Sequence, residues 1–248
     1  MIQVDVLCQR FLFFLREKYQ VSPKISLELI SHVLVHPSYA HEKSLSTSYE
    51  KLEFLGDSIA NAIITTKLCE IYPTESEGTL SRLKSALIST DSLSNLSRII
   101  ELEKYLCTTG LTPEEFSINN GKTLGRAFEA LMGAFYQALG FDECKVFLEK
   151  IITEWEQRHQ ESWFNKDRLL SLDVKSILQE KLHAEGLLNP QYVMLEHIKN
   201  TTRDEFVMAL MLDDKEVARA KALSKKDAEK LVAKKILDNW TLIKDFLS

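Results

Sequence analysis

Glycine and proline are scarce in this chain of 248 residues, which contains eight glycines and five prolines. Architectures with many tight turns depend on these two residues, so their scarcity favours helices. No stretch approaches the roughly 20 consecutive apolar residues that a membrane-spanning helix needs. The first residues also lack the basic segment and the small-residue cleavage site of a secretory signal. The composition therefore predicts a mainly helical, cytoplasmic protein with no membrane partner.

Cysteine is equally sparse, with four residues that are widely separated in the sequence. They form no C-x-x-C pair and no Cys/His pair of the kind that binds zinc. A disulfide framework is also excluded by this spacing, which is typical of reduced thiols in a cytoplasmic protein. The four are Cys8, Cys69, Cys107 and Cys144.

Positive charge is in deficit overall, because the net charge is −5. One segment departs from this balance: residues 215–235 carry eight Lys or Arg and three Asp or Glu, a local excess of +5. Such a stripe is typical of a surface that binds phosphates. The alternative is a solvated helix face with internal ion pairs, which would be the preferred interpretation of an isolated stripe.

Apolar spacing predicts helices through most of the first 150 or so residues. Ser81 and Asp91 are suited to begin two of them as N-caps. Turn-forming residues in 111–122 predict a loop. The expected helices are 6–19, 27–34, 49–71, 80–89, 92–100, 125–138 and 143–157.

The pattern changes after residue 173. A helix is expected at 174–183, followed by alternating segments typical of half-buried strands and a final helix, 225–237, capped by Ser224. The expected strands are 192–197, 205–212 and a weaker 217–222. The predicted domain boundaries are therefore 1–157 for the helical domain, 158–171 for a linker, and 172–248 for the second domain with a helical tail.

Two carboxylates, Glu53 and Asp57, lie four residues apart in an otherwise apolar part of the 49–71 helix. On a helix this spacing places both on one face, about one turn apart. Carboxylates near an apolar face are costly to desolvate unless a cation meets them. Hard oxygen ligands of this kind suit Mg²⁺. Glu129 on a later helix offers a third carboxylate, and Arg126 lies one turn before it.

The run Y-E-K-L-E-F-L-G-D-S at residues 49–58 and the run G-R-A-F-E-A-L at 125–131 resemble the ribonuclease III family. The family signatures read close to E-R-L-E-F-L-G-D-S and D-A-F-E-A-L. In the second half, S-K-K-D-A-E at 224–229 resembles the start of the second helix of a double-stranded RNA-binding domain. The resemblance implies a mainly α fold, an all-α nuclease domain followed by a small α-β-β-β-α RNA-binding domain.

The resemblance further implies a homodimeric endoribonuclease that cleaves double-stranded RNA, for example ribosomal RNA precursors, with Mg²⁺ or Mn²⁺ as the metal ion. By position, Asp57 and Glu129 are the expected catalytic residues. The expected metal ligands are Glu53, Asp57, Glu129 and Glu77. His36 is expected to cap a helix or pack rather than to act as a base. The residues expected to bind RNA are Gln179, Lys199, Arg203, Lys225, Lys226 and Lys230.

Two features depart from the family pattern. In the RNA-binding half, residues 199–203 replace a loop resembling G-P-x-H, so the histidine expected there is absent. In the nuclease half, Arg126 stands where the family has an aspartate, and arginine cannot ligate a cation. Either Arg126 points outward and leaves a weakened site of three carboxylates, or it closes the site as an ion pair. The second outcome gives the alternative function, an inactive protein that binds double-stranded RNA and uses the nuclease domain as a dimer scaffold.

Overall fold

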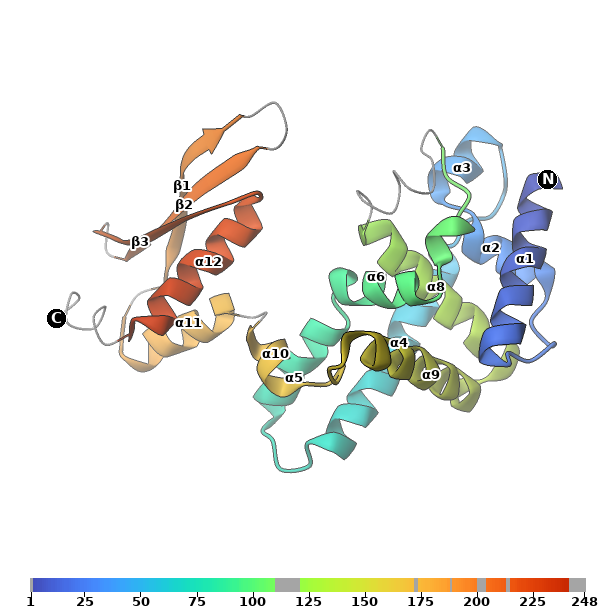
Figure 1. Ribbon diagram of the computed structural model, residues 1–248, viewed down its shortest axis with the longest axis horizontal. Coiled ribbons are helices and arrows are strands. Elements are labelled where there is room, and N and C mark those ends of the chain that lie inside the picture. Colours follow the sequence, from blue (N-terminus) through green and yellow to red (C-terminus); the bar gives the residue numbers. More distant parts are fainter. Residues whose placement is uncertain are drawn as a thin grey trace. The chain divides into compact units, whose positions relative to one another are not determined.

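The computed structural model describes residues 2–109, 121–171, 174–187, 189–199, 204–212 and 215–240. The chain divides into two compact units, Met1–Lys166 and Asp167–Ser248 (Figure 1). In these described ranges no helix is long and apolar enough to cross a membrane. The four cysteines are free thiols; Cys69 is exposed, and the other three are buried.

The first unit is helical in its described part. Its predicted helices are all present, and the predicted range 27–34 coincides with the observed helix. The elements are α1 (Ile2–Tyr19), α2 (Leu27–Leu34), α3 (Pro37–Glu42), α4 (Glu50–Ile71), α5 (Glu77–Leu87), α6 (Thr90–Ile99), the 3₁₀ helix η1 (Leu102–Lys104), α8 (Gly121–Leu139) and α9 (Phe141–His159).

The predicted starts of two helices were wrong. Helix α5 begins four residues before Ser81, because the Ser76 hydroxyl accepts a hydrogen bond from the Thr79 backbone N–H. Helix α6 is capped by Ser89 rather than by Asp91, through a bond from the Ser92 N–H. Both serines satisfy an N–H group that would otherwise lack a partner in the first turn. The predicted loop at 111–122 was also too long by two residues, since α8 begins at Gly121; the rest of that loop lies outside the described residues.

Helices α4 and α8 cross at very short range and make the most extensive helix contact of the unit (Figure 1). A Cβ atom built on Gly56 would lie 1.7 Å from the carbonyl oxygen of Glu129, and one on Gly133 would lie 2.2 Å from that of Leu52. Only glycine therefore permits this approach of the two backbones. The crossing brings the Glu53–Asp57 turn of α4 beside Glu129 of α8.

The range predicted as a linker, 158–171, begins as part of the first unit. Trp163 is buried and packs edge-on against Trp155, with ring centroids 4.8 Å apart. The Tyr72 hydroxyl donates to the Phe164 carbonyl at 2.5 Å. The division between the two units falls after Lys166, at the start of α10 (Lys166–Ser171).

The second unit has the predicted order of helix, three strands and helix. Its elements are α11 (Val174–Ala184), β1 (Gln191–Ile198), β2 (Glu205–Leu212), β3 (Lys215–Ala222) and α12 (Lys225–Asp238). The sheet is antiparallel in the order β1-β2-β3, with a bulge in β1 between Met194 and Glu196. Both helices pack on one face of the sheet (Figure 1). The alternate residues Met208, Leu210 and Leu212 of β2 enter the core, as period-two spacing requires.

Candidate active site and RNA-binding surface

The carboxylates of α4 line a pocket of about 310 Å³. Glu50, Glu53 and Asp57 are spaced by three and four residues, so they lie on one face of the helix. Glu129 reaches the same pocket from α8, because the glycines at the crossing hold the two backbones together. The expected convergence of Glu53, Asp57 and Glu129 is therefore present in the structure. Phe54 and Arg126 complete the lining.

The pocket has an excess of negative charge, and this excess perturbs its acids. The pKa of Glu129 is raised to about 7, first by burial and then by the charges of Asp57 and Glu53, whereas Arg126 opposes this shift. Burial also raises the pKa of Glu53, again against the effect of Arg126. One arginine thus compensates the carboxylates only in part. Such a cluster favours the approach of a further cation.

Arg126 takes an intermediate position between the two outcomes expected from the sequence. Its Nε lies 3.4 Å from Oε1 of Glu53, which makes an ion pair. Its side chain is nevertheless 61% exposed, whereas that of Glu53 is 21% exposed. The guanidinium therefore lies at the mouth of the pocket. It pairs with one carboxylate there and does not bridge all of them.

One neighbour of the carboxylates, Asn61, supports the site through a hydrogen bond to Asp57. The Asn61 amide donates to Oδ1 of Asp57 at 2.9 Å and also to the Asp57 carbonyl, which fixes that side chain. Asn61 follows Asp57 by four residues, a spacing that places the two side chains on one face of the helix. The sequence therefore contained a signal for this contact, which was not among the predictions. His36 behaves as expected: its Nδ1 accepts from the Ser38 N–H and caps α3, and its ring packs edge-on against Tyr49.

In the second unit, lysines gather at the start of α12. Lys225 and Lys226 are exposed in its first turn, and Lys230 is half-buried one turn later. Ser224 caps the helix through a bond from the Asp227 N–H, as predicted. Lys225 Nζ also lies 5.9 Å from the centre of the Phe206 ring. Cations at a helix N-terminus, together with its free N–H groups, suit the binding of phosphates.

Comparison with known proteins agrees with this geometry. A family model described as ribonuclease-III-like matches residues 26–155, and one described as a double-stranded RNA binding motif matches 174–239. Ribonuclease 3 of Borreliella burgdorferi is 33% identical over 221 residues, which is 88% of each chain. Ribonuclease 3 of a Sulfurovum species is 34% identical over 85% of this chain and 90% of that protein. The chain belongs to the ribonuclease III family.

A solved structure supports the same assignment for the first unit. The nuclease domain of ribonuclease III from Campylobacter jejuni matches with a TM-score of 0.51 and 25% identity. The match covers 57% of this chain and 95% of that domain, and the structure is described as showing flexibility in a region involved in dimer formation. This ribonuclease III family member thus combines a nuclease domain with a double-stranded RNA binding motif.

Glu77 is the predicted metal ligand that the fold does not bring to the pocket. It lies in the first turn of α5, where its Oε1 accepts a bond from the Ser81 hydroxyl at 2.7 Å. Helix α4 extends about 27 Å from Glu53 to its end at Ile71, at 1.5 Å per residue. Glu77 follows that far end and does not line the pocket. Glu77 therefore does not join Glu53, Asp57 and Glu129 in the pocket, and its role as a metal ligand stays a prediction.

The remaining residues expected to bind RNA are dispersed. Gln179 of α11 donates to the Asn189 side chain at 3.1 Å, and Lys199 is exposed just after β1. Arg203 lies outside the described residues. Part of the basic stripe is neutralised within the unit, since Arg219 pairs with Glu216 at 2.6 Å. The same holds for Lys221 and Glu205, at 3.0 Å.

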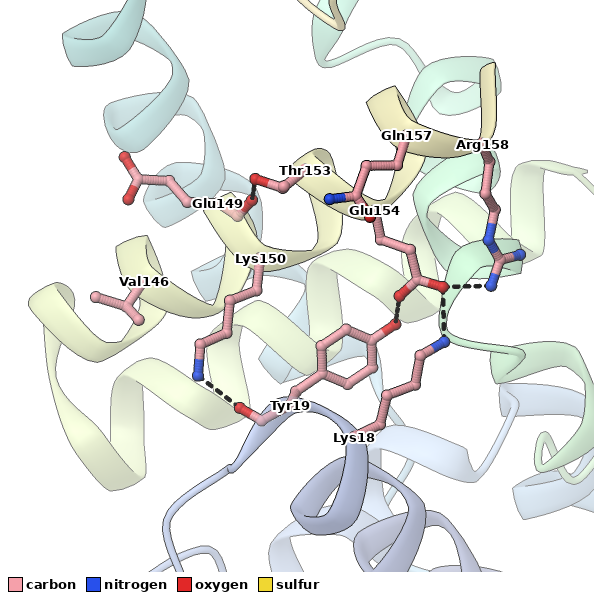
Figure 2. A pocket seen from close by; sticks show the side chains of 9 residues that line it. All are labelled: Lys18, Tyr19, Val146, Glu149, Lys150, Thr153, Glu154, Gln157 and Arg158. Carbon is pink, nitrogen blue, oxygen red and sulfur yellow. Dashed lines mark hydrogen bonds and ion pairs between the residues drawn. The ribbon is translucent and has the colours of Figure 1, made fainter. Parts of the chain in front are cut away.

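A larger cavity, of about 740 Å³, lies between the end of α1 and α9 (Figure 2). Figure 2 shows that Glu154 is its central group and accepts bonds from Tyr19, Lys18 and Arg158. Lys150 donates to the Tyr19 carbonyl at 2.7 Å. These bonds join α1 to α9. The cavity contains none of the residues expected to act on RNA.

Proposed function

We propose that this chain is an endoribonuclease that hydrolyses phosphodiester bonds of double-stranded RNA in the cytoplasm, in the processing of structured transcripts such as ribosomal RNA precursors. The observation that carries the proposal is the convergence of Glu53, Asp57 and Glu129 at the α4–α8 crossing. The same chain carries a double-stranded RNA binding motif. Family membership supports this assignment over that of an inactive RNA-binding protein.

The chemistry of the pocket fits a hard divalent cation, Mg²⁺ with Mn²⁺ as a substitute. Its ligands would be the carboxylates of Glu53, Asp57 and Glu129. The pKa of Glu129 is raised first by burial and then by the charges of Asp57 and Glu53, and a bound cation would offset these charges. Across the described ranges, no three His, Cys, Asp or Glu side chains stand close enough to hold an ion as they are. A bound ion would supply an activated water and stabilise the charge that develops on the phosphate.

The residues of the chain then have separate tasks. Asn61 holds Asp57 in one orientation through its amide. Without a bound cation, burial and the charges of Asp57 and Glu53 raise the pKa of Glu129 to about 7, and a cation in the pocket would favour its ionised form. Arg126 weakens cation binding: two unit charges about 5 Å apart repel by roughly 3 kcal/mol at an effective dielectric of 20, and a divalent ion doubles this. Exposure of the arginine to solvent reduces that figure.

We also propose that the chain acts as a homodimer that pairs through α4. Phe54 lies beside the carboxylates and is 82% exposed, which is unusual for a large apolar side chain. The Campylobacter jejuni relative is described as having a region involved in dimer formation. Phe54→Ser is expected to yield monomers in sedimentation at micromolar concentration. Val146→Ser, at a 46% exposed position of α9, is the control and should leave the dimer intact.

The activity itself is tested with the full chain and a long RNA duplex in the presence of Mg²⁺ or Mn²⁺. Asp57→Asn is expected to abolish cleavage and to retain duplex binding, because it removes a ligand of the pocket and leaves the second unit unchanged. Asp142→Asn, at an exposed position of α9, is the matched control. If the unaltered chain binds the duplex but does not cut it in the presence of either ion, the proposed activity is wrong and the inactive RNA-binding alternative holds.

A further inference from the structure

Arg126 is the one cationic side chain among the described residues that line the pocket. The other four ionisable groups of the lining are carboxylates: Glu50, Glu53, Asp57 and Glu129. An RNA strand that enters this pocket brings further negative charge, so the carboxylates repel it. A positive group at the mouth of the pocket is the feature of this chain that offsets that repulsion.

The guanidinium is arranged so that it can contact a second partner. Its Nε faces Oε1 of Glu53 at 3.4 Å, and in the described part of the chain no further ion pair or hydrogen bond engages its terminal nitrogens. The side chain is 61% exposed. A guanidinium carries five N–H donors in a rigid fork, and its two terminal nitrogens match the oxygens of a phosphate. Glu53 therefore fixes the orientation of the guanidinium through Nε and leaves its two terminal nitrogens available to a phosphate.

We propose that Arg126 is a substrate-binding residue whose terminal nitrogens contact an RNA phosphate at the mouth of the pocket, while Glu53 holds the side chain through Nε. The inference rests on the proposed function, since RNA must reach this pocket. It gives Arg126 two opposed effects. The same charge that repels a divalent ion attracts the phosphate, so a substitution that favours the ion should weaken the binding of RNA when no ion is present.

The first test measures binding of a short RNA duplex to the full chain in EDTA, where no cleavage occurs, over a series of salt concentrations. Arg126→Gln is expected to weaken binding by roughly tenfold or more, as loss of a charge-assisted hydrogen bond does. The slope of log K against log salt should become shallower by about 0.9 or less, which corresponds to one phosphate. Arg126→Lys should keep the slope but lose part of the affinity, because lysine lacks the fork.

The matched control is Lys24→Gln, which removes one positive charge at an exposed position that does not line the pocket. It should change neither the slope nor the affinity by a comparable amount. Arg126→Asp should weaken binding in EDTA more than Arg126→Gln does, even where it speeds cleavage in Mg²⁺. Weaker binding in EDTA together with faster cleavage in Mg²⁺ would show that Arg126 contacts a phosphate. An arginine that only repels the metal ion would give faster cleavage with no loss of binding.

The second test locates the contact on the RNA. Duplexes in which one phosphate at a time is replaced by a neutral methylphosphonate are bound to the unaltered chain and to Arg126→Gln. One or two replacements beside the cleavage position should weaken binding of the unaltered chain several-fold and have no effect on the variant. If every replacement affects both proteins equally, or if Arg126→Gln binds as tightly as the unaltered chain with the same salt slope, the inference is wrong. A chain that neither binds nor cuts duplex RNA would instead overturn the proposed function.

Discussion

Glu129 shows how single residues of the pocket are tuned by their surroundings. It is half-buried, and its neighbours Asp57 and Glu53 add negative charge, so the pKa of this acid is raised to about 7 from a usual value of 4.5. The ionised form is therefore less favourable in the folded chain than in the unfolded chain. Without a bound cation, Glu129 costs folding free energy at neutral and higher pH.

This leads to a pH-dependent prediction for Glu129→Gln, measured by urea unfolding in EDTA. The stabilising contribution of the protonated acid is complete below about pH 4.5 and is lost as the pH rises to about 7. The variant keeps a neutral side chain at all pH values. It should thus be more stable than the unaltered chain by about 1 to 3 kcal/mol above pH 7, and close to it at pH 4.5.

The exposed Glu143→Gln is the control for this experiment, because Glu143 lies in the first turn of α9 away from the pocket lining. Its effect on the free energy of unfolding should stay within about 0.5 kcal/mol. A difference between Glu129→Gln and the unaltered chain that is constant from pH 4.5 to 8 would show that the pKa of Glu129 is not raised.

At the scale of helices, the pocket exists because α4 and α8 approach closely at two glycines. Gly56 faces the Glu129 carbonyl, and Gly133 faces that of Leu52. The carboxylate positions are therefore set by backbone contact, which is less variable than contact through long side chains. A larger residue at either glycine must separate the helices and move Glu129 away from Glu53 and Asp57.

Gly56→Ala is expected to lower the free energy of unfolding by about 3 kcal/mol or more, since its Cβ would lie 1.7 Å from a backbone oxygen. Gly78→Ala provides the contrast on α5, where an added Cβ meets nothing within 4 Å. That change should be neutral or stabilise the fold by about 0.4 to 1 kcal/mol. Denaturant unfolding of both variants checks the prediction, and equal stabilities would contradict the described crossing.

The sequence predicts the helices well because apolar periodicity is a local property, as the coincidence at 27–34 shows. Helix starts are harder to predict here, since serines recur at 76, 81, 85 and 89 and the local pattern does not distinguish the caps. The pair Glu53 and Asp57 follows from one helix alone. The position of Arg126 against Glu53 depends on how two helices cross, which no local pattern contains.

At the scale of the whole chain, the two units carry different parts of the proposed activity. The carboxylate pocket belongs to Met1–Lys166, and the lysines at the start of α12 belong to Asp167–Ser248. Each unit has its own core, and the second is built from α11, the sheet and α12. Binding of the duplex should therefore depend on the second unit even when the pocket is inactive.

Lys225→Ala combined with Lys226→Ala is expected to weaken duplex binding by the full chain. The slope of log K against log salt should fall by roughly one to two units, because each lost phosphate contact contributes about 0.9 or less. The control is Lys215→Ala with Lys234→Ala, which removes the same charge from exposed positions outside the first turn of α12. If both pairs weaken binding equally, net charge alone explains it and α12 has no special role.

The most direct test of the account is the Mg²⁺ dependence of duplex cleavage by the unaltered chain and by Arg126→Asp. Arginine at the mouth of the carboxylate pocket repels a divalent ion, and aspartate adds an oxygen ligand in its place. The unaltered chain should need high Mg²⁺, or Mn²⁺, and Arg126→Asp should cut at least tenfold faster at about 1 mM Mg²⁺. Full cleavage by the unaltered chain at that concentration, unchanged by Arg126→Asp, would contradict the account.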